Sequence, residues 1–591
     1  MEIEFHGVQE PPAPFREEFF FGIWHPESRI ALRRCAPGTD GDAVRLGRNW
    51  ALVGSCLTRG NPGSSLVHAR SWTAGNDPRH PDRALDALAF RGYLLDPPIH
   101  SWSPSEALFE YWENAHREHD GVFSAALIAR EGRTLTICSD VFGISPIYFR
   151  RIGDLVLFAS APRYLRQRGD GLDAVAARMI MQRGALCGDV SLVPGVRRVP
   201  PGRVVTFSDE GVRETFWFDY GSLPAGDLPI TSTNLIAAEQ SFQESMSRCC
   251  RLMPDVESVV PFSSGDDSRR IAASLHAHRQ PFRASTVSGL IKGRYDYDGL
   301  LTPPMAARFG FRHRVLPAAD AECYATHDRW CRWLFSSEVS DHTWMWPMIE
   351  DLGGGPQLVF DGLVGDIVGN TGFGEAFLYE LRGEALLEAL ARLAFGPPRI
   401  RALSDDAWVP ARAVDEVLKD HLRFLPENLN RCDLAFLLIR ARRGVAPWSQ
   451  HLLPVGNIAV YPYLVLNHVR TTLQYDPRDK LKQTLQARCL QAYWPEYYSF
   501  PGSRRPPPDF PAVRRKTADD LVLARVRQLF YECGRSVWKE ELAEWLTGPA
   551  WCAALATRLA PRMTLSTGWW LRPLLMLAAE KRSGAAAIVV R

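Results

Sequence analysis

Short apolar runs separated by glycine, proline and aspartate characterise residues 1–225. Four of these runs have the length of a strand: Ala125–Ala129, Thr134–Ile137, Pro146–Phe149 and Leu155–Phe158. Strands that follow one another this closely are typical of antiparallel sheets packed in layers. The pattern therefore predicts an antiparallel, β-rich domain that ends near Pro200-Pro201-Gly202 and a linker at residues 222–229.

The pattern changes after residue 232, where helical and strand-like segments alternate. Helices are expected over residues 234–252 and 269–277, and strands at residues 258–262, 286–287 and 357–360. Such alternation predicts a parallel α/β sheet. The rest of the chain is expected to be mainly helical, with tryptophans that hold helices together at positions 538, 545, 551, 569 and 570. We therefore predict an α/β protein with domains at residues 1–225 and 232–510 and a helical C-terminal extension at residues 511–591.

The composition excludes several classes of protein. Hydrophobic residues make up 46% of the chain and charged residues 23%, which excludes a mostly disordered protein. The net charge is only +2, so nothing favours nucleic acid or a membrane as a partner. The 12 cysteines include no Cys-x-x-Cys pair, the first residues do not resemble a signal peptide, and no apolar run approaches the roughly 20 residues of a membrane helix. We predict a cytoplasmic protein with reduced thiols.

The polar segment Ser263–Ser268 stands between a predicted strand and a predicted helix. Its small residues allow a tight turn that directs several backbone N–H groups toward one anion at the positive end of the helix. The serine hydroxyls add donors for phosphate oxygens, whereas Asp267 would repel phosphate unless a divalent cation lay between them. The segment favours a phosphate loop with Asp267 as a magnesium ligand, and the alternative is an ordinary helix cap.

A second glycine-containing loop, Asp361–Asp366, follows the predicted strand that ends at Phe360. Two such loops, each ending a strand and carrying an aspartate, can meet at the carboxyl edge of one sheet, where open α/β sheets bind ligands. Asp366 is then a second carboxylate for the same magnesium ion. The alternative is a glycine-rich turn and a surface loop, which explains one such segment better than it explains the pair.

In these two loops the chain resembles asparagine synthetases and their relatives. Ser263–Ser268 is similar to the Ser-Gly-Gly-x-Asp-Ser pyrophosphatase loop of that family, and Gly362–Asp366 is similar to its Gly-Glu-Gly-Ala-Asp segment. The N-terminal half is similar to the family's glutaminase-type domain at Asp120–Ala126, Ser139–Phe149, Leu157–Ser160 and Pro194–Gly202. The likeness extends in order from about residue 85 to residue 500.

The resemblance implies both a fold and a reaction. The fold is an N-terminal glutaminase-like domain of the Ntn type followed by an ATP-pyrophosphatase domain of the adenine nucleotide α-hydrolase-like type. The reaction adenylates a carboxylate with ATP, and an amine then displaces AMP, a chemistry that depends on fixed donors and a metal ion. The resemblance assigns Mg²⁺ to Asp267 and Asp366. It assigns ATP to Ser263, Ser264, Gly265, Asp266, Asp267, Ser268, Val287 and Gly362.

The N-terminal half departs from the family pattern at its catalytic positions. Glutaminase domains of this type use a cysteine at the mature N-terminus, but residue 2 is Glu2 and the first cysteine is Cys35. Arg91-Gly92 stands where the family has its glutamine-binding Asn-Gly. We therefore expect no glutamine hydrolysis and an N-terminal domain that is retained as a scaffold.

The synthetase half departs from the pattern as well. Ser264 replaces a glycine, which requires a negative φ or some strain. Leu363 replaces the glutamate or tyrosine that is tied to deprotonating the nucleophile in asparagine synthetases and β-lactam synthetases, and Asp361 and Asp341 are alternative bases. The family's late catalytic lysine has no obvious counterpart. Arg504 or Arg505 stands nearest to its position and can stabilise phosphate charge, whereas Lys480 and Lys482 are expected to be solvated helix residues.

Two other motifs carry less information. His116 and His119 are spaced i, i+3 without a third ligand, so metal binding is disfavoured. The aromatic segment Ser340–Trp346 fits a hydrophobic core better than the lining of an acceptor pocket.

Taken together, the sequence favours an ATP-dependent, AMP-forming amide ligase that takes its amine from the substrate. β-Lactam synthetases and lasso-peptide cyclases are relatives without a working glutaminase, and in both one molecule carries the amine and the carboxylate. Effective molarities of about 10⁵ M or more lessen the need for a strong base. Leu363 therefore favours macrolactam formation in natural-product biosynthesis, with a peptide and its processing protease as partners. The alternatives are an asparagine synthetase-like amidotransferase for another small molecule and a non-catalytic nucleotide-binding scaffold.

Overall fold

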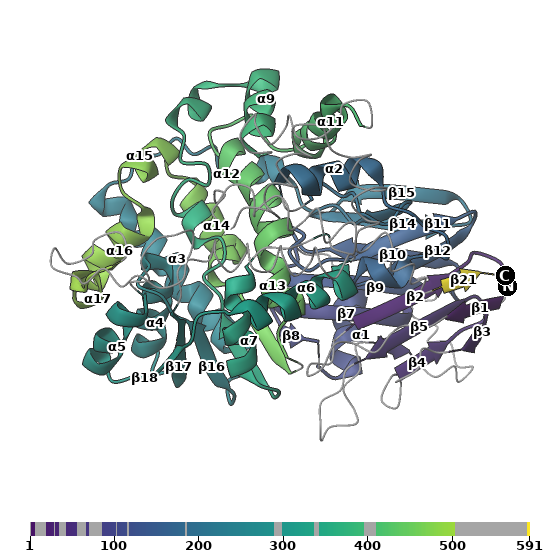
Figure 1. Cartoon of the computed structure of the whole chain (residues 1–591), viewed down its shortest axis with the longest axis horizontal. Coiled ribbons are helices and arrows are strands. Elements are labelled where there is room, and N and C mark those ends of the chain that lie inside the picture. The colour runs from purple at the N-terminus through teal and green to yellow at the C-terminus, as the bar shows by residue number, and fades with distance from the viewer. Residues whose placement is uncertain are drawn as a thin grey trace, which may run out of the picture.

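The computed structural model shows an α/β protein with antiparallel sheets in its N-terminal half and a parallel sheet in its C-terminal half (Figure 1). The antiparallel sheets form the right-hand side of this view, and the parallel sheet with its helices forms the left-hand side. The described residues are 2–5, 19–28, 30–34, 43–55, 67–69, 85–101, 103–114, 118–183, 186–288, 298–335, 338, 342–394, 409–454, 456–502 and 588–590.

Two antiparallel sheets in the N-terminal half share a hydrophobic core. Phe20, Trp50, Ile128 and Phe158 are among the side chains buried in it. The first sheet has the order β15 (Gly211–Phe216), β14 (Arg203–Ser208), β10 (Thr134–Ser139), β9 (Gly121–Ala129), β7 (Leu85–Leu95) and β6 (Val67–Ala69), with β8 (Pro98–His100) beside β7. The second has the order β13 (Val196–Arg198), β11 (Tyr148–Ile152), β12 (Leu155–Ala159), β2 (Phe19–Trp24), β5 (Trp50–Ser55) and β4 (Ala43–Leu46).

The four strands predicted from the apolar runs are present, with one shifted boundary. β9, β10 and β12 contain the predicted residues, whereas β11 begins at Tyr148 rather than at Pro146. Proline has no N–H to donate to the ladder, so a strand boundary after Pro146 is expected.

A small sheet joins the two ends of the chain. β1 (Glu2–Phe5) pairs in parallel with β3 (Ala31–Arg34) and antiparallel with β21 (Ile588–Val590), at the far right of Figure 1. The predicted helical extension is therefore wrong for residues 588–590. The rest of that extension, including all five of its tryptophans, lies outside the described residues.

The parallel sheet of the C-terminal half has five strands. Their order is β18 (Arg312–Leu316), β17 (Phe282–Val287), β16 (Glu257–Pro261), β19 (Gln357–Phe360) and β20 (Asn457–Val460). β16, β17 and β19 correspond to the three predicted strands, whereas β18 and β20 lie at the edges and were not predicted. The central strand β16 pairs with both β17 and β19, so the segments that follow these three strands leave the same edge of the sheet.

Helices surround this sheet and connect the two halves. The predicted helices correspond to α3 (Ser232–Cys250) and α4 (Asp266–Ala277). The other α-helices are α1 (Ser105–Asn114), α2 (Ala174–Arg183), α5 (Asp298–Phe309), α6 (Ala321–Phe335), α7 (Trp346–Leu352), α8 (Gly365–Val368), α9 (Gly383–Ala394), α11 (Ala411–Leu422), α12 (Arg431–Phe436), α13 (Ala446–His451), α14 (Leu466–Leu473), α15 (Pro477–Lys482), α16 (Leu485–Tyr493) and α17 (Pro495–Ser499). η5 (Leu437–Val445) is a π-helix, and short 3₁₀ turns are η1 (Pro162–Leu165), η2 (Tyr220–Ser222), η3 (Thr343–Met345), η4 (Ala376–Glu380) and η6 (Pro462–Leu464).

One hydrophobic core extends through both halves of the molecule. It includes Tyr93 and Phe142 from the N-terminal half and Phe242 and Phe360 from the C-terminal half. The predicted linker is also held in place, because the Leu228 N–H donates to the Gln474 carbonyl at 2.9 Å. The two halves therefore pack as one unit rather than as separate domains on a free tether.

Buried ion pairs reinforce the contact between the halves. Arg442 on η5 is fully buried, pairs with Asp189 at 2.8 Å and donates to the Val199 carbonyl at 3.0 Å. The next residue, Arg443, donates to the Val190 carbonyl of the N-terminal half at 3.0 Å and pairs with buried Glu338, whose carboxylate accepts from the Leu192 N–H at 2.9 Å. Desolvation makes such pairs costly to form, but removing one partner leaves the other charge buried.

The expectation that Lys480 is solvated is wrong. Its side chain is fully buried, and burial lowers the pKa of its amine to about 8, while the Asp433 and Asp476 carboxylates act to raise it. Lys482, by contrast, is exposed as predicted and pairs with Asp479 at 2.8 Å.

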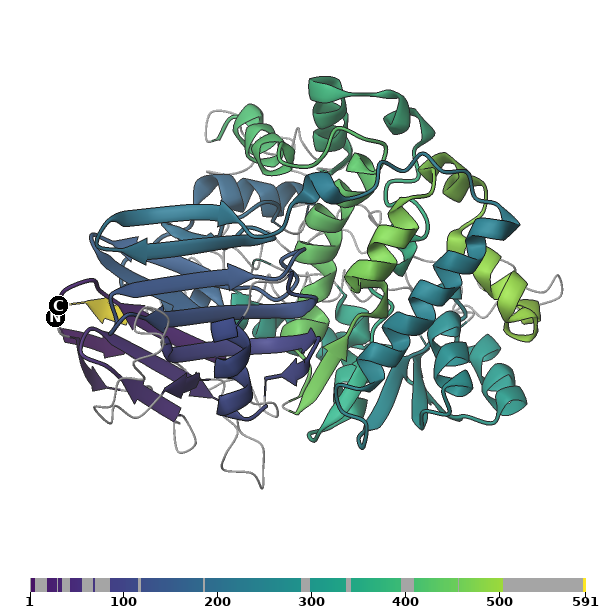
Figure 2. The same cartoon turned by 180° about the vertical axis from the view of Figure 1, so that it is seen from behind.

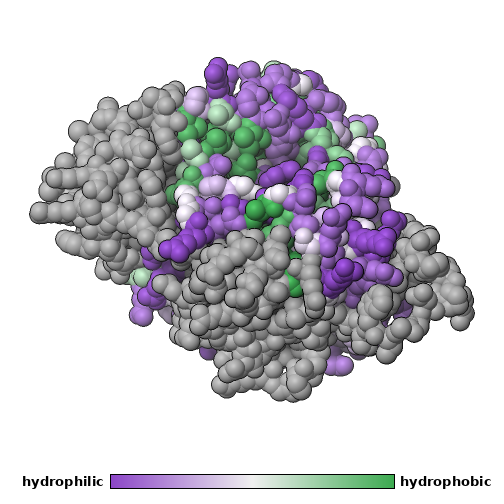
Figure 3. Space-filling model, turned by 90° about the vertical axis from the view of Figure 1, so that its right-hand side faces the viewer, coloured by the Kyte–Doolittle hydropathy of each residue, from purple (hydrophilic) through white to green (hydrophobic). Residues whose placement is uncertain are grey.

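Among the described residues, none of the helices is long and apolar enough to cross a bilayer. On the face shown in Figure 3, the described residues are mainly hydrophilic, with apolar patches between them.

Candidate active site

The serine-rich loop forms the turn between β16 and α4. The Ser263 and Ser268 hydroxyl oxygens lie 3.0 Å apart, and the Gly265 N–H donates to the Ser263 hydroxyl at 3.2 Å. Gly265 is the N-cap of α4, and no side chain caps this end of the helix. The loop thus presents hydroxyls and a helix N-terminus on the same side of the sheet edge.

Ser264 fits the turn without strain. It is not among the described residues that have a positive φ, so the conformation that would favour glycine is not required here. Its N–H and its hydroxyl both donate to Asp298 Oδ1, at 2.7 and 2.6 Å. Asp298 begins α5 and was missed in the sequence, because nothing in the local pattern connects it with a loop more than 30 residues earlier.

The second loop follows β19 and reaches the first. The Asp361 N–H donates to the Val460 carbonyl at 2.9 Å, and the Leu363 N–H donates to Asp361 Oδ1 at 2.9 Å. Val364 has a φ of 73°, an uncommon conformation for a β-branched residue and a local source of strain. Gly365 allows close approach, because a Cβ at this position would lie 2.7 Å from Asp267 Oδ1.

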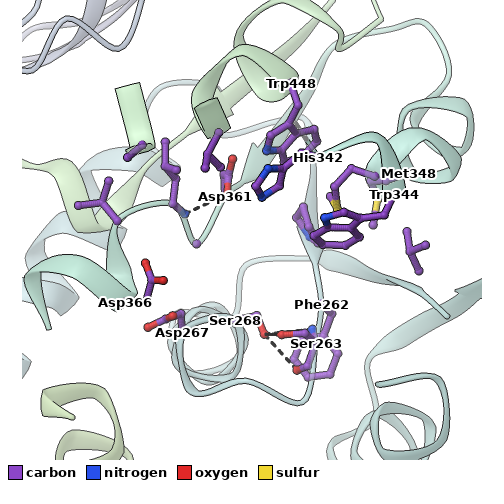
Figure 4. A pocket seen from close by; sticks show the side chains of 18 of the residues that line it. Phe262, Ser263, Asp267, Ser268, His342, Trp344, Met348, Asp361, Asp366 and Trp448 are labelled. Atoms are coloured by element: carbon purple, nitrogen blue, oxygen red, sulfur yellow. Dashed lines mark hydrogen bonds between the residues drawn. The ribbon is translucent and has the colours of Figure 1, made fainter. Parts of the chain in front are cut away.

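A cavity of about 400 Å³ lies between the two loops (Figure 4). Asp267 and Asp366 point toward each other on one side of it, and Trp344 and Met348 lie on the opposite side. Asp361 lies on a third side, near Trp448 and His342. The cavity has the size of a small-molecule site and combines apolar walls with a few convergent polar groups.

The two facing carboxylates fit a magnesium–phosphate site. Within the described residues, no group of three or more His, Cys, Asp or Glu side chains could hold a metal by itself. Magnesium is commonly bound by one or two carboxylates, several waters and substrate phosphates, so a third protein ligand is not required. Asp267 and Asp366, with the serine loop beside them, would hold Mg²⁺ together with a phosphate group.

Asp361 has the properties of a general base. It is buried at the cavity wall, and this burial raises the pKa of its carboxyl to about 6, while the Ser449 hydroxyl and the Leu363 N–H favour the ionised form. A base with a pKa slightly below the operating pH is ionised and still able to accept a proton. Leu363, which has no such capacity, is buried beside it and lines the same cavity.

The residues assigned to ATP are divided between two neighbouring cavities. Ser263, Asp267, Ser268, Val287 and Gly362 line the first one. A second cavity of about 310 Å³ lies against the other side of the loop and is lined by the remaining three residues: Ser264, Gly265 and Asp266. The loop therefore separates the two cavities.

The predicted arginines Arg504 and Arg505 lie outside the described residues, as does Asp341. The chain just before Arg504 is nevertheless fixed beside the serine loop. Buried Arg269 on α4 donates to the carbonyls of Ser264 at 2.6 Å and Pro501 at 2.7 Å. A Cβ on Gly502 would lie 3.0 Å from the Ser264 carbonyl oxygen, so this segment passes the loop at close range.

Several residues of the cavity were missed or underestimated in the sequence. Arg440 on the π-helix η5 lines the cavity, together with Trp448 on α13. His342 and Trp344 also line it, although their segment was expected to belong to the core. Trp346 does belong to the core, where its indole N–H donates to Glu350 at 2.9 Å.

In the N-terminal half, the residues that the resemblance assigns to the glutaminase positions make contacts of other kinds. Glu2 lies within β1 and pairs with Ala31. Arg91, at the position of the family's glutamine-binding asparagine, points across to His451 in the C-terminal half, with 3.0 Å between their nitrogens. His116 lies outside the described residues. His119 packs among aromatic side chains, and its Nδ1 atom lies 2.6 Å from the Tyr111 hydroxyl oxygen.

A comparison with known protein families finds a match within the N-terminal half. Residues 103–218 match the family described as a glutamine amidotransferase domain. No curated protein sequence matches the chain. Among solved structures, glutamine phosphoribosylpyrophosphate amidotransferase from B. subtilis, complexed with ADP and GMP, is similar at 16% identity over 58% of this chain and 81% of that one, with a TM-score of 0.20.

A second solved structure gives the same result. A structure described as the allosteric regulatory enzyme of purine biosynthesis is similar at 14% identity over 51% of this chain and 80% of that one, with a TM-score of 0.19. Superpositions this poor say nothing about activity. Residues 103–218 therefore resemble a glutamine amidotransferase domain, and they are joined to a parallel α/β half with its own cavity.

Proposed function

We propose that the protein is an ATP-dependent, AMP-forming amide ligase that works without hydrolysing glutamine. The observation that carries this proposal is the meeting of Asp267 and Asp366 beside the serine loop. The two aspartates come from segments about 100 residues apart, yet they face one cavity at the carboxyl edge of the sheet. Two carboxylates beside a loop of hydroxyl donors support this proposal, because Mg²⁺ is usually bound by one or two carboxylates together with substrate phosphates.

In the first step, a substrate carboxylate oxygen attacks the α-phosphorus of ATP, and the bond from that phosphorus to the pyrophosphate oxygen breaks. Ser263, Ser268 and the N-terminus of α4 donate to the phosphate oxygens, and Arg504 or Arg505 adds positive charge. Asp267 and Asp366 would hold Mg²⁺, which would supply positive charge to neutralise the departing pyrophosphate. Val287 and Gly362 adjoin the nucleoside.

In the second step, an amine nitrogen attacks the acyl carbon, and the bond from that carbon to the AMP oxygen breaks. The nitrogen loses a proton, which Asp361 accepts because Leu363 cannot. The apolar walls formed by Trp344, Met348 and Trp448 exclude water from the acyl-adenylate and thereby protect it from hydrolysis.

We further propose that the amine and the carboxylate belong to one molecule. Intramolecular attack has a high effective concentration and tolerates a weak base such as Asp361 better than attack by free ammonia does. The wide apolar walls of the cavity favour a peptide over a small polar amino acid. The expected partners are then a precursor peptide and the protease that releases it, in the cytoplasm, and the product is a macrolactam.

The test is to incubate the full chain with ATP, Mg²⁺ and candidate peptides or amino acids, and to separate the nucleotide products. AMP and pyrophosphate, formed in equal amounts with the amide, are expected. ADP formation, or no turnover with any substrate from neighbouring genes, would contradict the proposal.

The pH dependence of amide formation should report on Asp361. Its raised pKa of about 6 means that the carboxyl is protonated, and inactive as a base, at lower pH. The rate of the amine step is therefore expected to fall about tenfold per pH unit below that value and to level off above it. Single-turnover measurements from about pH 5 to pH 8 test this. If the rate of Asp361→Asn falls at low pH in the same way as the wild-type rate, Asp361 is excluded as the base.

A non-catalytic, nucleotide-binding scaffold is the second candidate, favoured by the buried leucine at position 363. An asparagine synthetase-like amidotransferase for another small molecule is the third. Binding of Mg-ATP without AMP formation under any condition would favour the scaffold, whereas AMP formation that depends on added ammonia would favour the amidotransferase.

A further inference from the structure

The contact between the two halves continues to the cavity wall. β7 of the N-terminal half and β20 of the C-terminal half adjoin at the border between the halves, where β20 is the light green strand in Figure 2. The N–H of Tyr461, the residue after β20, donates to the Tyr93 hydroxyl at 3.0 Å. The preceding carbonyl, that of Val460, accepts from the N–H of Asp361. Tyr93 therefore fixes the backbone on which Asp361 rests.

Arg91, two residues earlier on β7, reaches the same place by a second route. Its side chain is only 6% exposed, and its guanidinium donates to the Gln450 carbonyl besides contacting His451. The Gln450 side-chain amide in turn donates to the Tyr461 hydroxyl at 2.6 Å. The Ser449 hydroxyl lies 2.9 Å from that same oxygen.

The donor and acceptor roles of the Tyr461 hydroxyl follow from these contacts. The Gln450 amide can only donate to Tyr461, so the phenol O–H is left to donate to Ser449. The Ser449 hydroxyl donates to the Ala446 carbonyl at 3.4 Å, and its nearness to Asp361 lowers the pKa of that carboxyl and so favours the ionised form. Burial and the Asp361 charge raise the pKa of Tyr461, while Gln450, Ser449 and Arg91 lower it. The Tyr461 phenol therefore interacts electrostatically with both Arg91 and Asp361.

We propose that Arg91 and Tyr93 of the glutaminase-like half are positioning residues for Asp361, acting through Gln450, Tyr461 and Ser449. The inference rests on the proposed function, in which Asp361 accepts the proton of the amine. The N-terminal half then contributes to the ligase site and is more than a retained scaffold. Arg91, which the resemblance places where related domains bind glutamine, is a cation that positions the base Asp361.

The surroundings of Asp361 make this route specific. Tyr461 faces it from the end of β20 and Ser449 from α13, whereas Arg440, His342 and Asp267 face the cavity side. Tyr461 contacts the N-terminal half directly, because its N–H donates to the Tyr93 hydroxyl. A loss of Arg91 should therefore act on Asp361 through the Tyr461 side and leave the two proposed metal ligands in place.

The test is an infrared titration of Asp361 in the substrate-free, full-length protein, with the band assigned by Asp361→Asn. In Arg91→Met the Gln450 carbonyl loses its donor and Ser449 loses its fixed position, so the pKa of Asp361 is expected to rise by about half a unit or more. Arg91→Lys, which keeps the charge, should restore part of the shift. Tyr93→Phe, which lacks only a hydroxyl, should shift the pKa in the same direction and carries the test if Arg91→Met does not fold.

Arg150→Met is the matched control, because Arg150 on β11 is also largely buried but pairs with Asp170 inside the N-terminal half. It should leave the Asp361 titration unchanged. An unchanged titration in both Arg91→Met and Tyr93→Phe, or an equal shift in Arg150→Met, would overturn the positioning role. Failure of the wild-type protein to form AMP would overturn the proposed function instead, and the two results are read from separate experiments.

Discussion

Replacing Asp366 or Asp267 by asparagine is expected to abolish adenylation while leaving the fold intact. The two carboxylates point toward each other on one side of the cavity, and each supplies a negative charge to a site whose ligand carries several. Losing a residue that only hydrogen-bonds to a metal ligand already costs about 10–100-fold in affinity, so the loss of a direct ligand should weaken Mg-ATP binding by at least about 100-fold. Calorimetric titration with Mg-ATP measures this.

The control for this experiment is Asp266→Asn. Asp266 neighbours Asp267 but lines the second cavity, so its variant should bind Mg-ATP nearly as well as the wild-type protein does. In the absence of metal, the two facing carboxylates repel each other, so Asp267→Asn and Asp366→Asn should melt no lower than the wild-type protein. Equal losses of Mg-ATP affinity in Asp266→Asn and Asp267→Asn would show that the ligands are wrongly assigned. Full activity in Asp366→Asn would show that the two loops do not form one metal site.

Arg442→Met should cause the largest loss of stability among single substitutions at the contact between the halves. The guanidinium is fully buried, pairs with Asp189 and donates to the Val199 and Gly143 carbonyls, at 3.0 and 3.3 Å. Removing it leaves a carboxylate and carbonyls without their buried donor, at a cost of about 3–5 kcal/mol. Denaturant unfolding followed by fluorescence and circular dichroism measures the change.

Arg423→Met is the comparison for this variant. Arg423 pairs with Asp420 at 2.5 Å, but both side chains are more than half exposed, so its loss should cost less than about 1 kcal/mol. Similar small losses in the two variants would contradict the view that the halves are held together by their buried polar contacts. A transition that splits into two steps only in Arg442→Met would support it strongly.

The sequence predicted the central strands and both loops because these elements have strong local signals. β16 and β19 are apolar runs that end at small, polar residues, and their pairing brings Asp267 and Asp366 together. The edge strands gave no such signal. β18 has the sequence Arg-His-Arg-Val-Leu and is largely exposed, and β20 is only four residues long and pairs with a strand about 100 residues earlier.

The cavity wall and the contact between the halves depend on long-range packing that no local pattern encodes. Lys480 has the sequence context of a solvated helix residue, yet the fold buries it beside Asp433 and Asp476. Arg440 and Trp448 line the cavity from η5 and α13, which lie about 80 residues or more after β19 in the sequence. Arg91 could be recognised as a departure from the glutamine-binding pattern, but its contacts with Gln450 and His451 required the folded structure.

The most direct test of the proposed ligase is pyrophosphate exchange in the absence of the amine. Peptides with a free carboxylate and a blocked amine are incubated with the full chain, ATP, Mg²⁺ and labelled pyrophosphate. If a carboxylate is adenylated reversibly at the site formed by Asp267 and Asp366, label will enter ATP only when a carboxylate substrate is present, and it will not do so in Asp366→Asn. Exchange of labelled phosphate instead, with formation of ADP, would contradict the account.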